Sequence, residues 1–207
     1  RHLGISPARP TSKPARPHTN AGEMRGGAPV NDNCAGAITL TPSASCTPVS
    51  GDVAGATESI AAILCNAYTG TADDDVWYKF TATVANMNIS VTGSANFDAV
   101  VDLRSGGCNG TNIACADATF DGGTETINAT GLMVGTQYYV RVFDWYDVAP
   151  ATTTFDICVY ATPPAHANDE CADAVIQNLS VPGTVSVSGD NTGATDAEGF
   201  GFNTTWE

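Results

Sequence analysis

The runs TQYYVRVF (residues 136–143) and TTFDICVY (residues 153–160) decide the fold of this 207-residue chain. In each run, large apolar side chains stand at every second position, so that they share one face of an extended segment. Tyr138, Val140 and Val142 form that face in the first run, and the second run repeats the alternation. This pattern predicts half-buried strands of an antiparallel sheet.

Short runs with the same alternation recur along the chain, separated by clusters of Gly, Asn, Asp or Thr. They cover residues 76–80, 87–92, 98–103 and 125–130. Only NCAGAIT, residues 33–39, has a helical pattern, and it is short. Many short strands without a long helix predict an all-β fold, a disulfide-stapled antiparallel β-sandwich of the jelly-roll or Ig-like type.

An internal repeat divides the chain. NDNCAGAI (31–38) aligns with NDECADAV (168–175), and VSGDVAGAT (49–57) aligns with VSGDNTGAT (187–195) at seven of nine positions. The repeat predicts four parts: an extended basic Pro-rich arm at 1–30, a β-sandwich module at 31–160, a Pro-rich joint at 161–167 and a partial second module at 168–207.

The partial second module is too short to bury a core of its own. Two explanations are open. Either the polypeptide continues into further modules, or a neighbouring chain completes the fragment by adding strands to its open edges.

Charge is distributed unevenly between the arm and the rest of the chain. The whole chain has 8 Lys and Arg against 22 Asp and Glu, a net charge of −14. Residues 1–30 hold five of the basic residues and one acid, net +4, so residues 31–207 hold three basic and 21 acidic residues, net −18. So acidic a body argues against nucleic acid as a partner, because that binding depends on cationic side chains that displace counterions.

The arm is expected to bind an acidic surface, either on its own chain or on a neighbouring copy. Its candidate contact residues are Arg9, Lys13, Arg16 and Arg25. No apolar run in the sequence reaches the roughly 18 residues that a membrane-spanning helix needs.

Seven cysteines, without a CxxC pair, argue for disulfides rather than zinc. Cys171 repeats Cys34 but has no partner within 168–207, so it pairs further along the polypeptide, pairs with another chain, or stays a free buried thiol. The turn-rich stretch between Cys108 and Cys115 predicts a disulfide between these two across a hairpin tip, and the other pairings stay open. Three disulfides in an oxidising, extracellular compartment are expected among the module's six cysteines, Cys34, Cys46, Cys65, Cys108, Cys115 and Cys158.

The order of these motifs resembles a known family. DDDVWYKFTA (73–82), ISV, FDAVVDL (97–103), a loop bracketed by cysteines, GTQYYVRVF (135–143) and TTFDICV resemble the pre-peptidase C-terminal type of jelly-roll sandwich. The closer likeness is to its NDxC-headed form, repeated in secreted and surface proteins of Bacteroidota and similar environmental bacteria. The resemblance covers about residues 28–160. It implies a non-catalytic appendage or stalk module that makes adhesion, carbohydrate or protein contacts and sometimes binds calcium.

No catalytic site is expected. His2, His18 and His166 fall in the arm or the joint, so no imidazole lies where the module could orient it for a Ser/Cys–His–acid relay. The motifs HExxH, GxSxG and GxGxxG are also absent. The sequence predicts a protein that is not an enzyme and requires no cofactor.

Calcium is the metal that the acidic loops favour, since it prefers carboxylate and other oxygen ligands. The resemblance implies a cation near Asp117, the acid after the second loop cysteine. Asp98 and Asp121 are the other candidate ligands. The alternative is that these acids only solubilise the loops.

Two features of the sequence point to sugars: aromatic residues in loops and glycosylation sequons. Tyr68, Trp145 and Tyr146 are expected in loops, where their rings would either stack on a bound sugar or cover the ends of the sandwich. Asn109, at the expected hairpin tip, is the first candidate for an attached glycan. The Asn-x-Ser/Thr sequons are at Asn88, Asn109, Asn128, Asn178 and Asn203.

Together these features predict a structural subunit of an extracellular filament or surface appendage. Copies would join head to tail, with the arm of one copy engaging the incomplete C-terminal module of the next in a contact that does not close into a ring. The alternative is a non-catalytic carbohydrate- or protein-binding module of a secreted multidomain protein, with glycans among its partners.

Overall fold

The computed structural model describes Lys13, residues 27–147 and residues 149–161. The chain divides into two units, Arg1–Ala161 and Thr162–Glu207, and the second unit lies outside the described residues. Within the described part, strands form nearly all of the regular structure, and η1 (Cys34–Gly36) is one turn of 3-10 helix.

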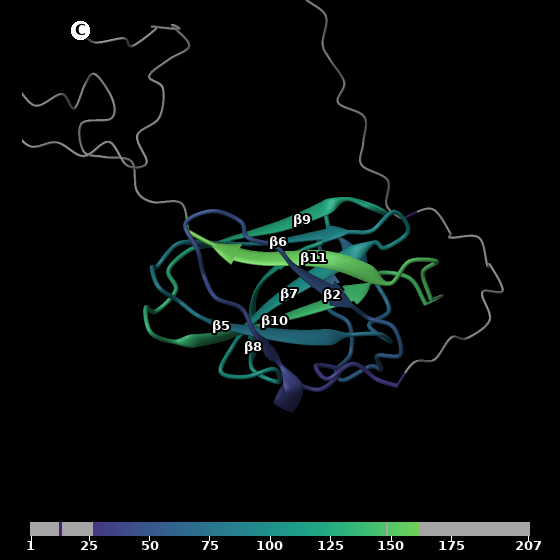
Figure 1. Cartoon of the computed structure of the whole chain (residues 1–207), viewed down its shortest axis with the longest axis horizontal. Helices are drawn as coiled ribbons and strands as arrows, with labels where there is room; N and C mark the ends of the chain where they lie inside the picture. Colours follow the sequence, from purple (N-terminus) through teal and green to yellow (C-terminus); the bar gives the residue numbers. More distant parts are fainter. Residues whose placement is uncertain (1–12, 14–26, 148, 162–207) are drawn as a thin grey trace, which may run out of the picture. The chain divides into compact units, whose positions relative to one another are not determined.

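Two sheets face one another and form a β-sandwich (Figure 1). The five-stranded sheet has the order β1 (Ile38–Thr39), β5 (Val76–Thr81), β10 (Gln137–Asp144), β7 (Ala99–Ser105) and β8 (Thr111–Ala116). The four-stranded sheet has the order β2 (Val49–Asp52), β11 (Thr154–Tyr160), β6 (Met87–Gly93) and β9 (Thr124–Ala129). A separate hairpin pairs β3 (Leu64–Cys65) with β4 (Tyr68–Thr69). All of these pairings are antiparallel except that of β1 with β5.

The core fills the space between the two sheets, as the alternation of apolar residues predicts. Phe155 of β11 stacks on Phe97 with ring centroids 5.4 Å apart and meets Tyr78 of β5 edge on at 6.0 Å. Each such buried ring or aliphatic side chain contributes about 1.5–3 kcal/mol. The strand residues expected to face inward, such as Val140 and Ile157, are fully buried here.

The outer face of the five-stranded sheet is buried as well, under the segment that precedes β5. Arg141 of β10 is 0% exposed there and donates from Nη1 to the carbonyl of Ile60 at 2.6 Å. Its guanidinium also lies 3.2 Å from Asp75 and 3.1 Å from Asp102. Trp77 is buried on the same face and donates to Ser59 Oγ at 2.8 Å.

Three disulfides join parts of the module that are distant in sequence, namely Cys34–Cys108, Cys46–Cys158 and Cys65–Cys115. The predicted Cys108–Cys115 disulfide is wrong. Cys115 pairs with Asp102 in the β7–β8 ladder, whereas Cys108 lies in the connection beyond Ser105. A strand advances about 3.4 Å per residue, so this register places the two cysteines too far apart for a disulfide.

The six strands expected from alternation are all present. NCAGAIT is only partly helical, because η1 spans three residues and the chain then enters β1. The remaining strands, β1, β2, β3, β4 and β8, were not predicted. Several other predictions lie outside the described residues: the rest of the arm with Arg9, Arg16 and Arg25, the joint at 161–167 beyond Ala161, the partial second module, Cys171, Asn178 and Asn203.

Candidate functional site

One end of the five-stranded sheet gathers acidic and aromatic residues from separate parts of the chain. β7 begins directly after Asp98 and β8 ends directly before Asp117, and these strands are antiparallel neighbours, so the two carboxylates lie at the same end. β10 also ends there, since Asp144 pairs with Ala99. The next residue, Trp145, donates its backbone N–H to the Asp98 carbonyl at 2.9 Å.

Lys13 binds between two of these carboxylates. Its Nζ lies 2.9 Å and 2.8 Å from the two oxygens of Asp98 and donates another hydrogen bond to Oδ1 of Asp117. The side chains of Lys13 and Asp98 are 0% exposed, and that of Asp117 is 1% exposed. Because an uncompensated charge is costly to bury, the carboxylates and the ammonium stabilise one another only while all remain in place.

Three aromatic rings surround the same ammonium. The distance from Lys13 Nζ to the ring centroid is 5.3 Å for Trp145, 5.5 Å for Tyr68 and 5.6 Å for Phe120. These distances are within the range of about 6 Å over which a cation is attracted to a ring face. We call Asp98, Asp117, Tyr68, Phe120 and Trp145 the ammonium pocket.

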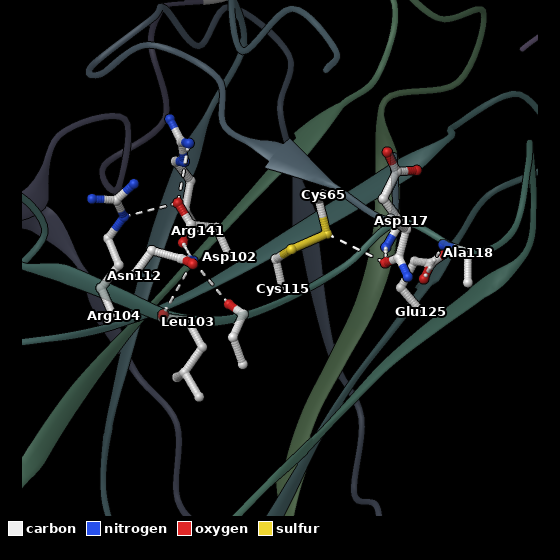
Figure 2. Close-up of a disulfide and its surroundings, with 12 residues drawn as sticks. Cys65, Asp102, Leu103, Arg104, Asn112, Cys115, Asp117, Ala118, Glu125 and Arg141 are labelled. Carbon is white, nitrogen blue, oxygen red and sulfur yellow. Dashed lines mark hydrogen bonds and ion pairs between the residues drawn. A yellow bond between two sulfur atoms is a disulfide. The ribbon is translucent and has the colours of Figure 1, made fainter. Parts of the chain in front are cut away.

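The β3–β4 hairpin positions Tyr68 in the pocket. Its turn residues Asn66 and Ala67 have φ values of 47° and 75°, the left-handed pair that a tight two-residue hairpin uses. Asn66 Oδ1 accepts the backbone N–H of Asp117 at 2.9 Å. The Cys65–Cys115 disulfide ties the hairpin to β8 close to Asp117, as Figure 2 shows.

Glu125 of β9 holds the loop that carries Asp117 and Phe120. Its carboxylate is 1% exposed and accepts the backbone N–H of Ala118 at 2.8 Å and the hydroxyl of Thr119 at 2.6 Å. Figure 2 shows Glu125 beside Asp117 and Ala118. The loop is therefore fixed from inside the module, and the pocket is largely preorganised for its ligand.

More carboxylates stand behind Asp98. Asp144 Oδ1 accepts the Asp98 N–H at 2.8 Å, and Asp74 Oδ1 accepts the Asp144 N–H at 3.0 Å. Burial raises the pKa of the Asp98 carboxyl, the hydrogen bond and charge of Lys13 lower it, and Asp117 and Asp144 raise it, with a resulting pKa of about 7. Burial also raises the pKa of Asp74 well above its usual range. A positive charge among these carboxyls lowers their pKa, as Lys13 does for Asp98, so this end of the sheet is stabilised in its ionised form by a cation.

The structure brings together two of the three predicted calcium ligands. Asp98 and Asp117 lie side by side, but the cation between them is the Lys13 ammonium. Asp121 is exposed in the β8–β9 loop. Among the described residues, no group of three or more His, Cys, Asp or Glu side chains is arranged to hold a metal ion. Calcium binding stays a prediction.

The predicted loop aromatics fall into two groups. Tyr68 and Trp145 belong to the pocket, with their rings edge on at a centroid distance of 6.4 Å. Tyr146 is 8% exposed and packs edge on against Trp145 at 4.9 Å, so it covers the end of the sandwich. Phe120 was missed, because a single aromatic residue in a polar loop gives no periodic signal.

Three of the five sequons lie on described residues. Asn109 is exposed in the β7–β8 connection, as expected for a hairpin tip. Asn88 and Asn128 are cross-strand partners in the β6–β9 ladder, the first half-buried and the second exposed. Their occupancy stays a prediction.

Comparison with known proteins adds a family to this geometry. Residues 30–157 match the family described as galactose binding domain-like and associated with T9SS, the type IX secretion system. No relative was found among curated proteins. The described part of the chain contains no helix long and apolar enough to span a membrane.

Two solved structures are similar at low identity. One is the pre-peptidase C-terminal domain of collagenase from Bacillus anthracis, at 17% identity and a TM-score of 0.40, covering 59% of this chain and 93% of that one. The other is Aeromonas hydrophila PliG, a periplasmic inhibitor of g-type lysozyme, at 14% identity and a TM-score of 0.35, covering 59% of this chain and 94% of that one.

The fold and the site define a disulfide-stapled β-sandwich module with a preorganised acidic and aromatic pocket. Because the family match covers most of the chain, the chain belongs to the T9SS-associated, galactose binding domain-like family. Together with the three disulfides, this membership identifies a module of a secreted or surface protein.

Proposed function

We propose that the chain is a non-catalytic structural subunit of an extracellular filament or surface appendage. In this proposal, the basic N-terminal segment of one copy binds the ammonium pocket of the next. The observation that carries it is that the pocket buries a lysine ammonium between Asp98 and Asp117. In the single chain described, this ammonium is the chain's own Lys13, and the proposal is that the same contact forms between copies.

The charge distribution supports the same contact. The segment that contains Lys13 has a net charge of +4 over residues 1–30, and the remainder has −18. Opposite fields favour and orient such an encounter. Since the segment and its binding site occupy different parts of one chain, a contact between copies is heterologous and can propagate without closing.

The place of binding differs from the sequence prediction. The sequence predicts that the arm binds the partial second module of the next copy, whereas the pocket lies on the β-sandwich module. The proposal therefore no longer depends on residues 168–207, and the completion of that fragment is a separate question.

Electron microscopy of the full chain and of matched variants tests the proposal. Wild-type chains are expected to form fibres in negative stain. Lys13→Gln chains are expected to remain single particles that still unfold cooperatively, at a lower temperature because Asp98 and Asp117 lose their buried countercharge. Lys79→Gln, which removes one positive charge from β5, is the matched control and should still form fibres. Fibres of Lys13→Gln chains would overturn the proposal.

A mixing experiment separates contact between copies from contact within one chain. Lys13→Gln retains the pocket, and Asp98→Asn/Asp117→Asn retains the arm. Neither variant should assemble alone, but a mixture should give dimers in light scattering, because each supplies what the other lacks. A mixture that stays monomeric would show that the contact is made within one chain.

The second candidate is a carbohydrate-binding module, favoured by the family description and by the paired rings of Tyr68 and Trp145. Aromatic faces hold sugars by stacking, and the neighbouring carboxylates would accept hydrogen bonds from hydroxyls. A glycan array with the full chain tests it. Binding that is lost in Trp145→Ala but kept in Tyr139→Ala, where the control residue is likewise a half-buried aromatic but lies on β10 away from the pocket, would support this function.

A further inference from the structure

We infer that the ammonium pocket is a selective receptor for a lysine side chain, and that Lys13 acts as its built-in competitor. The inference deepens the proposed function and rests on its assignment of Lys13 as the ligand, but it does not require that copies assemble. It names the ligand class, a primary alkylammonium carried by a polypeptide.

The acceptors of the pocket match the donors of a lysine ammonium. A lysine ammonium has three N–H donors and no acceptor. In the pocket it meets both oxygens of Asp98 and Oδ1 of Asp117, three acceptors at hydrogen-bond distance. The ring faces of Tyr68, Phe120 and Trp145 take up the remaining space around Nζ. Each of these groups is a partner for a compact cation.

The pocket suits a guanidinium or a neutral ligand less well than an ammonium. A guanidinium is a wide planar fork that binds best to acceptors lying in its own plane. Here the three ring centroids are all within 5.6 Å of a single point, which suits a compact cation better than a planar group. A neutral ligand fits less well, because it would leave two buried carboxylates, Asp98 and Asp117, without a countercharge.

The pocket is already occupied by a residue of the same chain. Lys13 is 6% exposed, and its ammonium fills the space between Asp98 and Asp117. Any other lysine must displace Lys13 to bind. Lys13 therefore sets a threshold for external ligands, and a chain without Lys13 should bind them more tightly.

Fluorescence anisotropy with a synthetic peptide tests the inference. The probe is residues 5–21, labelled at its N-terminus, prepared with Lys13, with Lys13→Arg, or with Lys13 acetylated. Full-length Lys13→Gln chain should bind the lysine peptide at least about 10-fold more tightly than either altered peptide, because only the lysine keeps a compact charge. Wild-type chain should bind the lysine peptide more weakly than Lys13→Gln chain does.

Two variants of the Lys13→Gln chain show where the peptide binds. Phe120→Ala removes a 41% exposed ring and should weaken lysine binding by roughly 2- to 5-fold, the size of one exposed cation–π contact. Val134→Ala is the control and should change nothing, because Val134 is 65% exposed in the turn that precedes β10, at the end of this strand opposite the pocket. Both changes are on the surface, so loss of folding does not confuse the result.

The outcomes separate this inference from the proposed function. Selective lysine binding by chains that form no fibres upholds the receptor and removes only the assembly. Equal affinity for the lysine and arginine peptides, or an unchanged affinity in Phe120→Ala, overturns the receptor even where wild-type fibres are seen.

Discussion

At Asp98, burial and a neighbouring positive charge have opposite effects on the pKa of the carboxyl. Its carboxyl is buried, its N–H is held by Asp144, and its pKa is raised to about 7 although Lys13 lies against it. Only the ionised carboxylate attracts an ammonium fully, so protonation of Asp98 and binding of lysine compete.

This competition predicts the pH dependence of peptide binding. Affinity of Lys13→Gln chain for the lysine peptide should rise from pH 5.5 to pH 8, by up to roughly 10-fold per pH unit while one proton is released. The other charged groups that face Asp98 are Asp117 and Asp144, which raise its pKa. Asp98→Asn should bind weakly at every pH with a flattened profile. If the affinity of Lys13→Gln chain that keeps Asp98 did not change with pH, this role of the carboxyl would be contradicted.

The same shift has a consequence for stability with the opposite dependence on pH. The folded protein holds a proton on Asp98 more tightly than the unfolded chain does, since the pKa is about 7 against an ordinary value of 3.8 for this carboxyl. The contribution of this group is therefore fully present below pH 3.8 and is lost as the pH rises toward 7. Lysine binding and folding thus place opposite demands on one carboxyl.

At the scale of elements, the β3–β4 hairpin connects the pocket to the sandwich. Four residues form two short strands, so the pairing alone gives it little stability. The Cys65–Cys115 disulfide and the Asn66 hydrogen bond to Asp117 anchor it. The pocket should therefore depend on this disulfide more than the fold does.

Paired serine substitutions test that dependence. Cys65→Ser/Cys115→Ser should lower the stability by about 4 kcal/mol or less, since it frees a loop of 50 residues, and should abolish lysine-peptide binding by a folded Lys13→Gln chain. Cys46→Ser/Cys158→Ser frees a loop of 112 residues, so its loss of stability should be at least as large, with binding retained. Calorimetry and anisotropy measure the two effects. Equal losses of binding in both variants would show that the hairpin has no special role.

The elements also explain which parts of the fold the sequence could predict. Runs such as 136–143 show clear alternation because one face packs on the core. β8 does not, because it is an edge strand whose first residues, Thr111 to Ile113, are exposed. Without β8 the register of Cys115 is unknown from the sequence, and the turn-rich stretch between the two residues wrongly predicts Cys108 as its partner.

At the scale of the whole molecule, the pocket is a product of topology rather than of a motif. The sequence singled out Lys13 as an arm residue, Asp98 and Asp117 as calcium ligands, and Tyr68 and Trp145 as sugar-binding rings. Each was noted for a different reason, because their separations along the chain carry no common period. Only the antiparallel order of β10, β7 and β8 places their neighbourhoods at one end of a sheet.

The charge distribution of the whole chain should mainly set the rate at which the peptide associates. The contacts in the pocket should mainly set the rate at which it dissociates. Exposed charges farther apart than the Debye length, about 10 Å at 0.1 M salt, are screened, whereas a buried pair such as Lys13 and Asp98 is screened much less. Raising NaCl from about 0.05 M to 0.5 M should therefore slow peptide association with Lys13→Gln chain by at least roughly 10-fold and change dissociation by less than about 2-fold. Stopped-flow fluorescence measures both rates.

A second peptide isolates the long-range part of this effect. Replacing Arg9 and Arg16 by Gln while Lys13 is kept should lower the association rate at low salt and leave the dissociation rate unchanged, because the pocket still holds the same ammonium. If salt or the loss of these arginines instead accelerates dissociation, the arginines contribute to the bound contact. The segment would then be held along its length by exposed charges, and the burial of Lys13 would not be the main source of its affinity.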